Sequence, residues 1–218
     1  MDYAAARHNM VESQIRTNQV TDPSVVAAMD ALPRELFVPK QLRGIAYVDE
    51  DLDLGNGRYL MEPMVLARLL QAAEIRSTDV VLDVGCGTGY STAVLARMAS
   101  AVVALECDAE LAARAGGLLA ELGADNAAVV TGPLAEGYTA QAPYDVIVLG
   151  GAVAEPPPAL CSQLADGGRL MAIVAGNGTG VGKATVTTRT AGTFSRRIVF
   201  DAATPLLPGF APDLGFVF

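Results

Sequence analysis

The sequence predicts an α/β fold with a mostly parallel, doubly wound sheet, a C-terminal antiparallel hairpin and an N-terminal helical segment. Three observations predict it. From residue 79 onward, short apolar runs alternate with helical stretches, which is typical of parallel strands joined by crossover helices. A glycine string follows the first apolar run directly, and two alternating runs, KATVTTRT and SRRIVFD, flank Ala191-Gly192-Thr193 near the C-terminus. At 218 residues the chain is long enough to bury a core without disulfides.

The first sixty residues are expected to form helices and loops. Residues 3–18 carry apolar side chains at helical spacing, and Asp22-Pro23 supplies a helix N-cap followed by proline at the first helical position. The second helix ends before Pro33, and the stretch PRELFVPK predicts an extended connector packed on the main domain. Residues 49–58 are turn-rich and acidic, and Glu62-Pro63 opens a helix that runs through Ala73.

Five strands and three helices are expected after residue 79. The strands are 80–84, 102–106, 127–130, 145–149 and 170–174, and the helices are 91–98, 109–122 and 158–164. We expect residues 1–62 to form an N-terminal, substrate-side segment and residues 63–218 the main domain, as one compact unit. In such a sheet, ligands bind at the carboxyl ends of the strands.

Composition narrows the classes of function. The formal net charge is −9, and no cluster of Lys and Arg forms a phosphate-binding patch, so nucleic acid is not an expected partner. No run of some eighteen apolar residues and no signal peptide is apparent, so we expect no membrane contact and a cytoplasmic location. Cys86, Cys107 and Cys161 lie far apart without a CxxC pair, which favours reduced thiols over disulfides or a metal site.

The glycine string predicts a ligand site. Gly85, Cys86, Gly87 and Gly89 lie between an apolar strand and a helix, where glycines allow a ligand to approach the backbone closely. The loop has the form GxGxG, and Asp83 precedes it by two residues, where a dinucleotide site needs no carboxylate. S-adenosylmethionine carries an ammonium and a sulfonium and no pyrophosphate, so it suits this loop. A structural turn and a dinucleotide site are the alternatives.

Two further elements extend the predicted cofactor site. Glu106 ends the next strand, about twenty residues beyond the loop, where a carboxylate can accept hydrogen bonds from two ribose hydroxyls. After the third strand, Gly132, Pro133 and Leu134 occupy the place where such sites contact adenine. Because Pro133 has no carboxylate and no backbone donor, this contact falls to the Leu134 amide and to apolar packing. Their neighbours Tyr90 and Cys107 complete the predicted set.

With these motifs in place, the chain resembles the protein-L-isoaspartate O-methyltransferase family. The resemblance covers most of the sequence and rests on MVESQIR, PRELFVP, AYVDEDLDLG, VLDVGCGTGY, APYDVIVL and LADGGRLMAIV. It implies a Rossmann-like methyltransferase fold and transfer of a methyl group from S-adenosylmethionine to the carboxylate of an isoaspartyl residue in a protein or peptide. It implies no metal and no strong base, because a carboxylate is already a nucleophile. The chain is expected to be a monomer or a homodimer.

The family's substrate segment has the form GQTISQP, and here it reads GRYLMEP over residues 57–63. Tyr59 stands where the family has threonine, and Met61 where it has serine. The resemblance therefore places Arg58, Tyr59 and Met61 beside the acceptor, with Asp49 in the acidic region that borders it. Met61 donates no hydrogen bond, so a second hypothesis stands beside isoaspartyl repair: the chain binds the cofactor but methylates another acceptor, or has a non-catalytic regulatory role.

The C-terminal segment LLPGFAPDLGFVF carries apolar residues that require burial. The sequence allows two places for it, a position over the pocket and an interface with another subunit.

Overall fold

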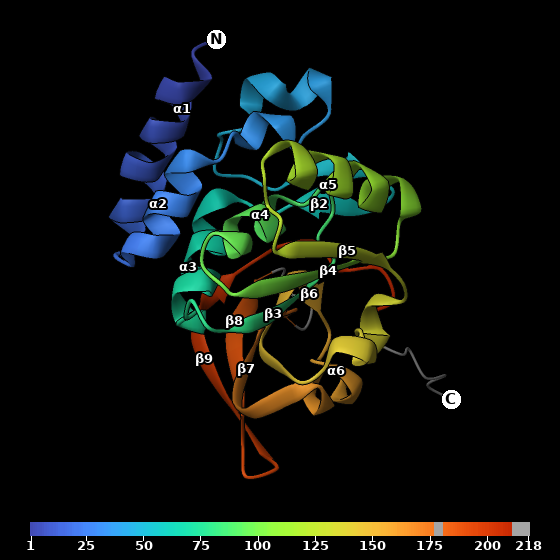
Figure 1. The fold of residues 1–218 in the computed structure, drawn as a ribbon. Coiled ribbons are helices and arrows are strands. Elements are labelled where there is room, and N and C mark those ends of the chain that lie inside the picture. Colours follow the sequence, from blue (N-terminus) through green and yellow to red (C-terminus); the bar gives the residue numbers. More distant parts are fainter. Residues whose placement is uncertain (177–180, 211–218) are drawn as a thin grey trace, which may run out of the picture.

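A computed structural model describes residues 1–176 and 181–210 and contains a seven-stranded sheet (Figure 1). The strands, in chain order, are β3 (Val80–Val84), β4 (Ala101–Glu106), β5 (Ala127–Thr131), β6 (Tyr144–Val153), β7 (Leu164–Val174), β8 (Gly182–Thr190) and β9 (Thr193–Ala202). Their order in the sheet is β5-β4-β3-β6-β7-β8-β9. The pairs from β5 to β7 are parallel and those from β7 to β9 are antiparallel. The five expected strands and the C-terminal hairpin are confirmed.

The strand order reverses between β3 and β6. From β3 the chain moves outward through β4 and β5, and it then returns to place β6 on the other side of β3. Ligands of doubly wound sheets bind at such a switch point, outside the carboxyl ends of the strands. The glycine string after β3 lies at that edge. β6 also runs four residues beyond the expected Leu149, with an irregularity between Val148 and Ala152.

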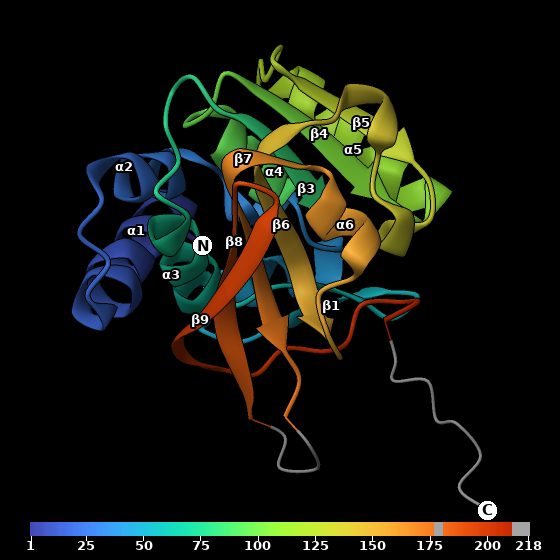
Figure 2. The same ribbon diagram turned by 90° about the horizontal axis from the view of Figure 1, so that it is seen from below.

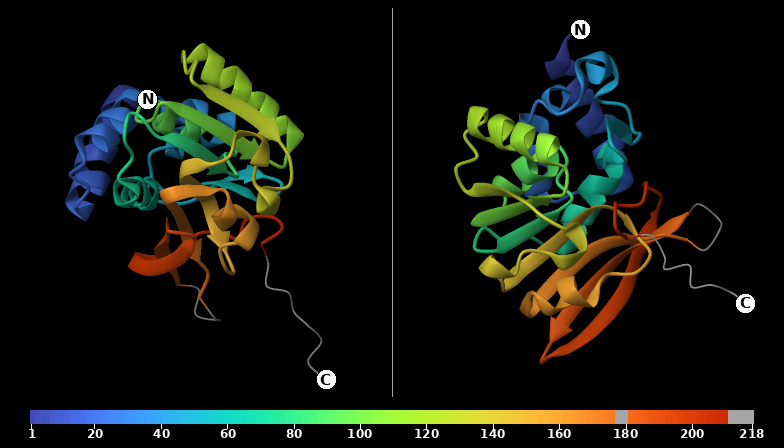
Figure 3. Two further views of the ribbon diagram at one scale, coloured as in Figure 1. Left: turned by 60° about the horizontal axis from the view of Figure 1, so that its bottom comes forward. Right: turned by 90° about the vertical axis from the view of Figure 1, so that its right-hand side faces the viewer.

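The two faces of the sheet bury separate apolar clusters because side chains alternate along each strand. Val81, Val102 and Val146 face a cluster shared with α3 (Pro63–Ala73), α4 (Tyr90–Ala96) and α5 (Ala109–Glu121). Leu82, Val103 and Ile147, one residue on, join a second cluster that includes Leu160 and Cys161 of α6 (Pro158–Ser162). Figures 1 and 3 show α5 on one side of the strands and α6 on the other.

The N-terminal segment packs on the α3 and α4 side (Figure 1). It contains α1 (Tyr3–Met10), η1 (Val11–Ile15), η2 (Arg16–Asn18) and α2 (Pro23–Ala31). Residues 3–18 are helical as expected, although the helix widens into a π turn at Val11–Ile15 and tightens into a 3-10 turn after it. Asp22 caps α2 through the amides of Ser24 and Val25, and Pro23 follows as expected.

The connector predicted for residues 33–40 packs on the core as expected, since Phe37 and Val38 are buried, but it is not extended. It contains the 3-10 turn η3 (Arg34–Leu36), and a second 3-10 turn, η4 (Lys40–Ile45), begins at its last residue. The side chain of Arg34, which is 0% exposed, donates hydrogen bonds to the carbonyl oxygens of Ala46 and Met61, both at 2.7 Å. The chain folds back around this buried cation, a long-range contact that local residue preferences do not reveal.

The acidic, turn-rich region contains a hairpin that we did not predict, β1 (Leu52–Gly55) with β2 (Arg58–Leu60). Gly55, Asn56 and Gly57 all have positive φ, which is why this turn is built from two glycines and an asparagine. Figure 2 shows β1 at the edge of the sheet where β6 ends. Among the helices of the described residues, none combines the length and the apolar character needed to cross a membrane.

Candidate active site

The glycine string forms the turn between β3 and α4. Gly85, Gly87 and Gly89 have φ values of +76°, +57° and +93°, a backbone conformation that other residues rarely adopt. The amides of Gly85 and Cys86 both donate to the carbonyl oxygen of Leu105 at the end of β4, at 2.7 and 3.2 Å. The turn is thus attached to the strand that carries Glu106.

Gly150 on β6 supports the turn from the other side, and sequence reasoning did not assign it this role. A methyl group added at Gly150 would lie 2.4 Å from the carbonyl oxygen of Gly85. The sequence offered one signal for this role, the pair Gly150-Gly151 after the expected strand 145–149. That signal can be interpreted only when β6 is known to lie beside β3.

Asp83 is completely buried beneath the turn. Its Oδ2 accepts hydrogen bonds from the hydroxyls of Ser91 and Thr92, each at 2.7 Å. Its Oδ1 is buried and has no hydrogen-bond partner within the described part of the chain. Burial raises the pKa of Asp83 to about 6, although the two hydroxyls lower it. A buried carboxylate oxygen without a donor is costly by itself and suits a positively charged ligand group.

Glu106 is the second buried carboxylate. It accepts hydrogen bonds from the amides of Gly87 at 2.6 Å and Cys107 at 2.8 Å. Arg58 donates to it from Nε at 3.1 Å and from Nη2 at 3.0 Å. Burial alone raises the pKa of Glu106, but the hydrogen bonds and charge of Arg58, together with the amides of Gly87 and Asp108, outweigh it, so the pKa lies below its usual value. The Asp108 amide and the Cys107 thiol also donate to it, each at 3.3 Å, so Glu106 is a negative charge held in place by several donors.

The segment that resembles the family's substrate loop lies against the turn. Tyr59, Met61, Gly85, Cys86 and Gly150 are among the residues that line a cavity of about 20 Å³. That volume holds about one water molecule, whereas sites for small ligands usually measure several hundred Å³. The acceptor side of the site is therefore nearly closed in this structure.

The acidic residues near this cavity hold the start of α3. Asp49 accepts from the amide of Met64 at 3.1 Å, and Asp51 accepts from the amide of Glu62 at 3.0 Å. Carboxylates stabilise a helix N-terminus in this way. Burial and the charges of Asp49, Asp51 and Glu50 raise the pKa of Glu62 to about 7. Asp49, expected to border the acceptor, thus has a definite capping contact.

The remaining residues of the predicted cofactor site differ in their exposure and in the groups that they contact. Gly132 donates from its amide to the Glu106 carbonyl oxygen at 3.0 Å, which places the loop after β5 next to Glu106. Leu134 is buried, Pro133 is exposed and Cys107 is exposed. Tyr90 begins α4, but its ring packs against Phe37 and under the Arg34 guanidinium, which is 4.8 Å from the ring centre. Tyr90 therefore contacts the N-terminal segment.

Part of the C-terminal segment covers the turn. Leu207 is 2% exposed, and methyl groups added at Gly85 and Gly151 would lie 2.8 and 2.9 Å from its Cδ2. Of the two places that the sequence allowed for this segment, Leu207 therefore occupies the one over the pocket. Phe216 and Phe218 lie outside the described residues.

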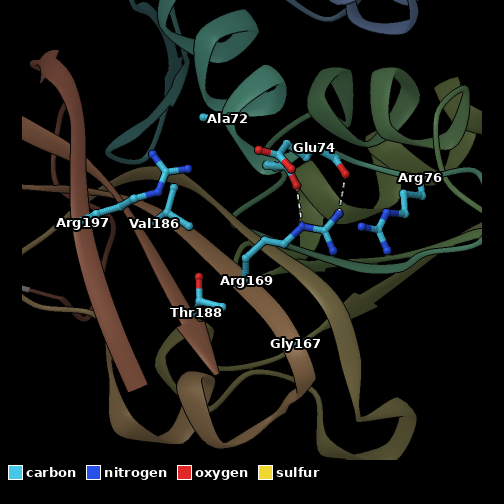
Figure 4. Close-up of a pocket in the computed structure, with 9 residues that line it drawn as sticks. Ala72, Glu74, Arg76, Gly167, Arg169, Val186, Thr188 and Arg197 are labelled. Atoms are coloured by element: carbon cyan, nitrogen blue, oxygen red, sulfur yellow. Dashed lines mark hydrogen bonds between the residues drawn. The ribbon is translucent and has the colours of Figure 1, made fainter. Parts of the chain in front are cut away.

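A larger hollow, of about 220 Å³, lies near the beginning of β7 and the end of α3 (Figure 4). Figure 4 shows Arg169 reaching from β7 toward the last turn of α3. It donates to the carbonyl oxygens of Ala73 and Glu74 at 2.5 and 2.6 Å, and it pairs with Asp79. Because these contacts satisfy the open end of a helix, we assign Arg169 a structural role.

The two buried carboxylates and the glycine turn fit S-adenosylmethionine. The two Glu106 oxygens already accept from a planar, two-pronged donor, as they would from two ribose hydroxyls. Asp83 offers an oxygen beneath the glycine turn that has no partner among the described residues. A doubly wound sheet with this turn after its first parallel strand and a carboxylate at the end of the second defines a Rossmann-like, S-adenosylmethionine-dependent methyltransferase.

Comparison with known proteins identifies the family. The model of the family protein-L-isoaspartate(D-aspartate) O-methyltransferase matches residues 5–199, and the chain belongs to this family. The protein-L-isoaspartate O-methyltransferase of Methanoculleus marisnigri is 45% identical over 168 residues, which cover 77% of this chain and 76% of that one. The protein of the same name from Koribacter versatilis is 43% identical over 169 residues, 78% of this chain and 76% of that one.

Solved structures agree on the fold. A structure named protein-L-isoaspartate O-methyltransferase superimposes with a TM-score of 0.80 at 23% identity, over 93% of this chain and 66% of that chain. A protein from Plasmodium falciparum, described as a putative protein-L-isoaspartate O-methyltransferase in complex with S-adenosyl-L-homocysteine, gives a TM-score of 0.78 at 20% identity. That match covers 91% of this chain and 96% of the other.

Proposed function

We propose that the chain transfers the methyl group of S-adenosylmethionine to the free carboxylate of L-isoaspartyl residues in proteins and peptides. The observation that carries the proposal is membership of the family over residues 5–199, together with the buried pair Asp83 and Glu106 around the glycine turn. The three cysteines are free, which is consistent with the reducing cytoplasm that we propose as its location. We expect a monomer or a homodimer.

The chemistry needs little from the protein beyond position. A carboxylate oxygen of the acceptor forms a bond to the methyl carbon, the carbon–sulfur bond breaks, and its electron pair stays on the sulfur, so no proton is transferred. Alignment of a nucleophile with its target contributes up to several kcal/mol. In this chain we assign cofactor placement to the glycine turn, Asp83 and Glu106, and acceptor placement to the segment that carries Tyr59 and Met61.

Tyr59 and Met61 both line the acceptor cavity. Tyr59 carries a hydroxyl, whereas Met61 carries a thioether, which is at most a weak acceptor. We therefore propose that the Tyr59 hydroxyl orients the acceptor carboxylate, in place of the hydroxyl-bearing residues at these positions in the family.

A methyl-transfer assay tests the function. The purified protein is incubated with labelled S-adenosylmethionine and either an isoaspartyl peptide or the same peptide with a normal aspartyl residue. We expect label only in the isoaspartyl peptide. Equal labelling of the two peptides, or none in either, would refute isoaspartyl specificity.

One variant and its control test the proposed role of Tyr59. Tyr59→Phe is expected to raise the KM for the isoaspartyl peptide about tenfold, with S-adenosylhomocysteine affinity unchanged, because one hydrogen bond to a charged group contributes roughly 1.5 kcal/mol. Tyr3→Phe, which removes a hydroxyl from the N-terminal helix, is the matched control and should behave as the wild type. An unchanged KM for Tyr59→Phe would remove this assignment.

A further inference from the structure

Arg58 lies inside the proposed cofactor site. Its side chain is 2% exposed and extends from β2 between the glycine turn and Glu106. Nε lies 3.1 and 3.3 Å from the two Glu106 carboxylate oxygens, and Nη2 lies 3.0 Å from Oε2. The same Nη2 donates to the carbonyl oxygen of Gly85 at 2.5 Å. The guanidinium is thus bound to both parts of the site at once.

This position coincides with the one that a cofactor needs. The Glu106 oxygens that accept from Arg58 are the atoms assigned to the ribose hydroxyls. A methyl group added at Gly85 would lie 2.7 Å from Arg58 Nη2, so the guanidinium covers the face of the turn that the glycines leave open. Two groups cannot occupy the same hydrogen-bonding positions, and the cavity of about 20 Å³ that remains nearby is far too small for a nucleoside.

The hairpin that carries Arg58 is fastened across the turn. Asn56, at its tip, donates from Nδ2 to Asp108 Oδ2 at 2.7 Å, at the start of α5. Leu54 lies over the glycine turn, since a methyl group added at Gly87 would come within 2.9 Å of its Cδ1. Leu52 and Leu60, at the base of the hairpin, are buried in the core, so the base is fixed. The tip is held only weakly, by one exposed hydrogen bond and one leucine contact, and the Gly55-Asn56-Gly57 turn allows its backbone wide freedom.

Exchange of Arg58 for a ligand is energetically balanced. A buried ion pair contributes little net stability, because the cost of removing both charges from water offsets their attraction. When Arg58 leaves, its guanidinium regains water, and Glu106 keeps its amide donors while new hydroxyl donors replace the guanidinium. Leaving Glu106 without any replacement would be costly, so the exchange is favourable only when a ligand supplies those donors.

We propose that Arg58 competes with the cofactor for Glu106, so that the β1–β2 hairpin is a lid whose release sets cofactor affinity. This inference rests on the proposed function and adds a regulatory contact to the same site. The observed affinity is then the intrinsic affinity reduced by the fraction of molecules in which Arg58 has left Glu106.

Calorimetric titration tests the competition. S-adenosylhomocysteine is titrated into the wild type, Arg58→Gln and the matched control Arg197→Gln, whose side chain is exposed on β9. We expect Arg58→Gln to lower the Kd about tenfold or more, because glutamine is neutral and cannot fill the two-pronged contact. Arg197→Gln should stay within about twofold of the wild type. An unchanged or higher Kd for Arg58→Gln would overturn the proposal.

A second variant keeps the test independent of the buried charge. Asn56→Gly removes the contact with Asp108, suits the positive φ at this position and leaves the pair between Arg58 and Glu106 intact, so it is expected to fold even if Arg58→Gln does not. It should lower the Kd about twofold to fivefold, as loss of one exposed hydrogen bond suggests. If its Kd equals that of the wild type, the hairpin does not act as a lid and the proposal fails.

The labelled-transfer assay, run in parallel, separates the two levels of failure. If the wild type binds the ligand and methylates the isoaspartyl peptide while neither variant binds more tightly, only the competition is refuted. If the wild type and both variants bind no ligand and transfer no label, the proposed function fails together with the inference.

Discussion

Replacement of Arg34 by methionine is expected to destabilise the fold strongly. Arg34 is 0% exposed and donates from Nε to Ala46 and from Nη2 to Met61, each at 2.7 Å. Its guanidinium also lies over the Tyr90 ring at 4.8 Å. Burial lowers the pKa of Arg34, and the neighbouring tyrosines act in the opposite direction. Methionine keeps the apolar stem but leaves two buried carbonyl oxygens without donors.

The magnitude follows from these contacts. Hydrogen bonds from a charged group contribute about 1.5–3 kcal/mol each, and a buried cation over an aromatic ring about 1–2 kcal/mol. The desolvation cost that Arg34 no longer incurs offsets part of this sum. We expect a loss of about 3–4 kcal/mol in the free energy of unfolding, or a fall in Tm of roughly 10 °C for a chain of this size.

Urea and thermal unfolding followed by circular dichroism measure the loss. Arg16→Met is the matched control, because Arg16 is about half exposed and, in the part of the chain that the structure describes, pairs only with Glu12 one turn away. Its loss should be below about 0.5 kcal/mol. Arg34→Met should also raise the KM for the isoaspartyl peptide, since Arg34 holds the backbone of Met61. A loss below about 1 kcal/mol for Arg34→Met would refute this account of how the N-terminal segment is held.

Three further predictions concern the site itself. Because burial raises the folded-state pKa of Asp83 from 3.8 to about 6, the folded state binds that proton more tightly. The stability that this group contributes is therefore full below pH 4 and is lost as the pH rises to 6. Across that window, the free energy of unfolding of Asp83→Asn, measured by urea titration, should gain up to about 3 kcal/mol over that of the wild type. Gly150→Ala should abolish S-adenosylhomocysteine binding in calorimetry, because its methyl group would meet the Gly85 carbonyl oxygen at 2.4 Å. The control is Gly116→Ala, in an open part of α5, which should stabilise the protein by about 0.5–1 kcal/mol. Iodoacetamide should label the exposed Cys107 well before the buried Cys86, and saturating S-adenosylhomocysteine should slow the Cys107 reaction; equal rates with and without ligand would contradict the assigned place of Cys107.

Local patterns in the sequence determined the sheet and the position of its ligand edge. Short apolar runs, the glycine string and the proline after Asp22 each act through near neighbours in the chain, so their meaning could be read without coordinates. Asp83 and Glu106 could be found in the same way, because each has a fixed offset from the glycine string.

Contacts between residues far apart in the sequence were decided only by the tertiary structure. The pair between Arg58 and Glu106 joins residues 48 positions apart, and the bond from Arg34 to Met61 spans 27. Gly150 matters only because β6 passes beside Gly85. The resemblance to the family placed Arg58 beside the acceptor, but only the fold shows that it pairs with Glu106. The sequence could not reveal this pair, because an arginine has the same local preferences whether its guanidinium faces water or a buried carboxylate.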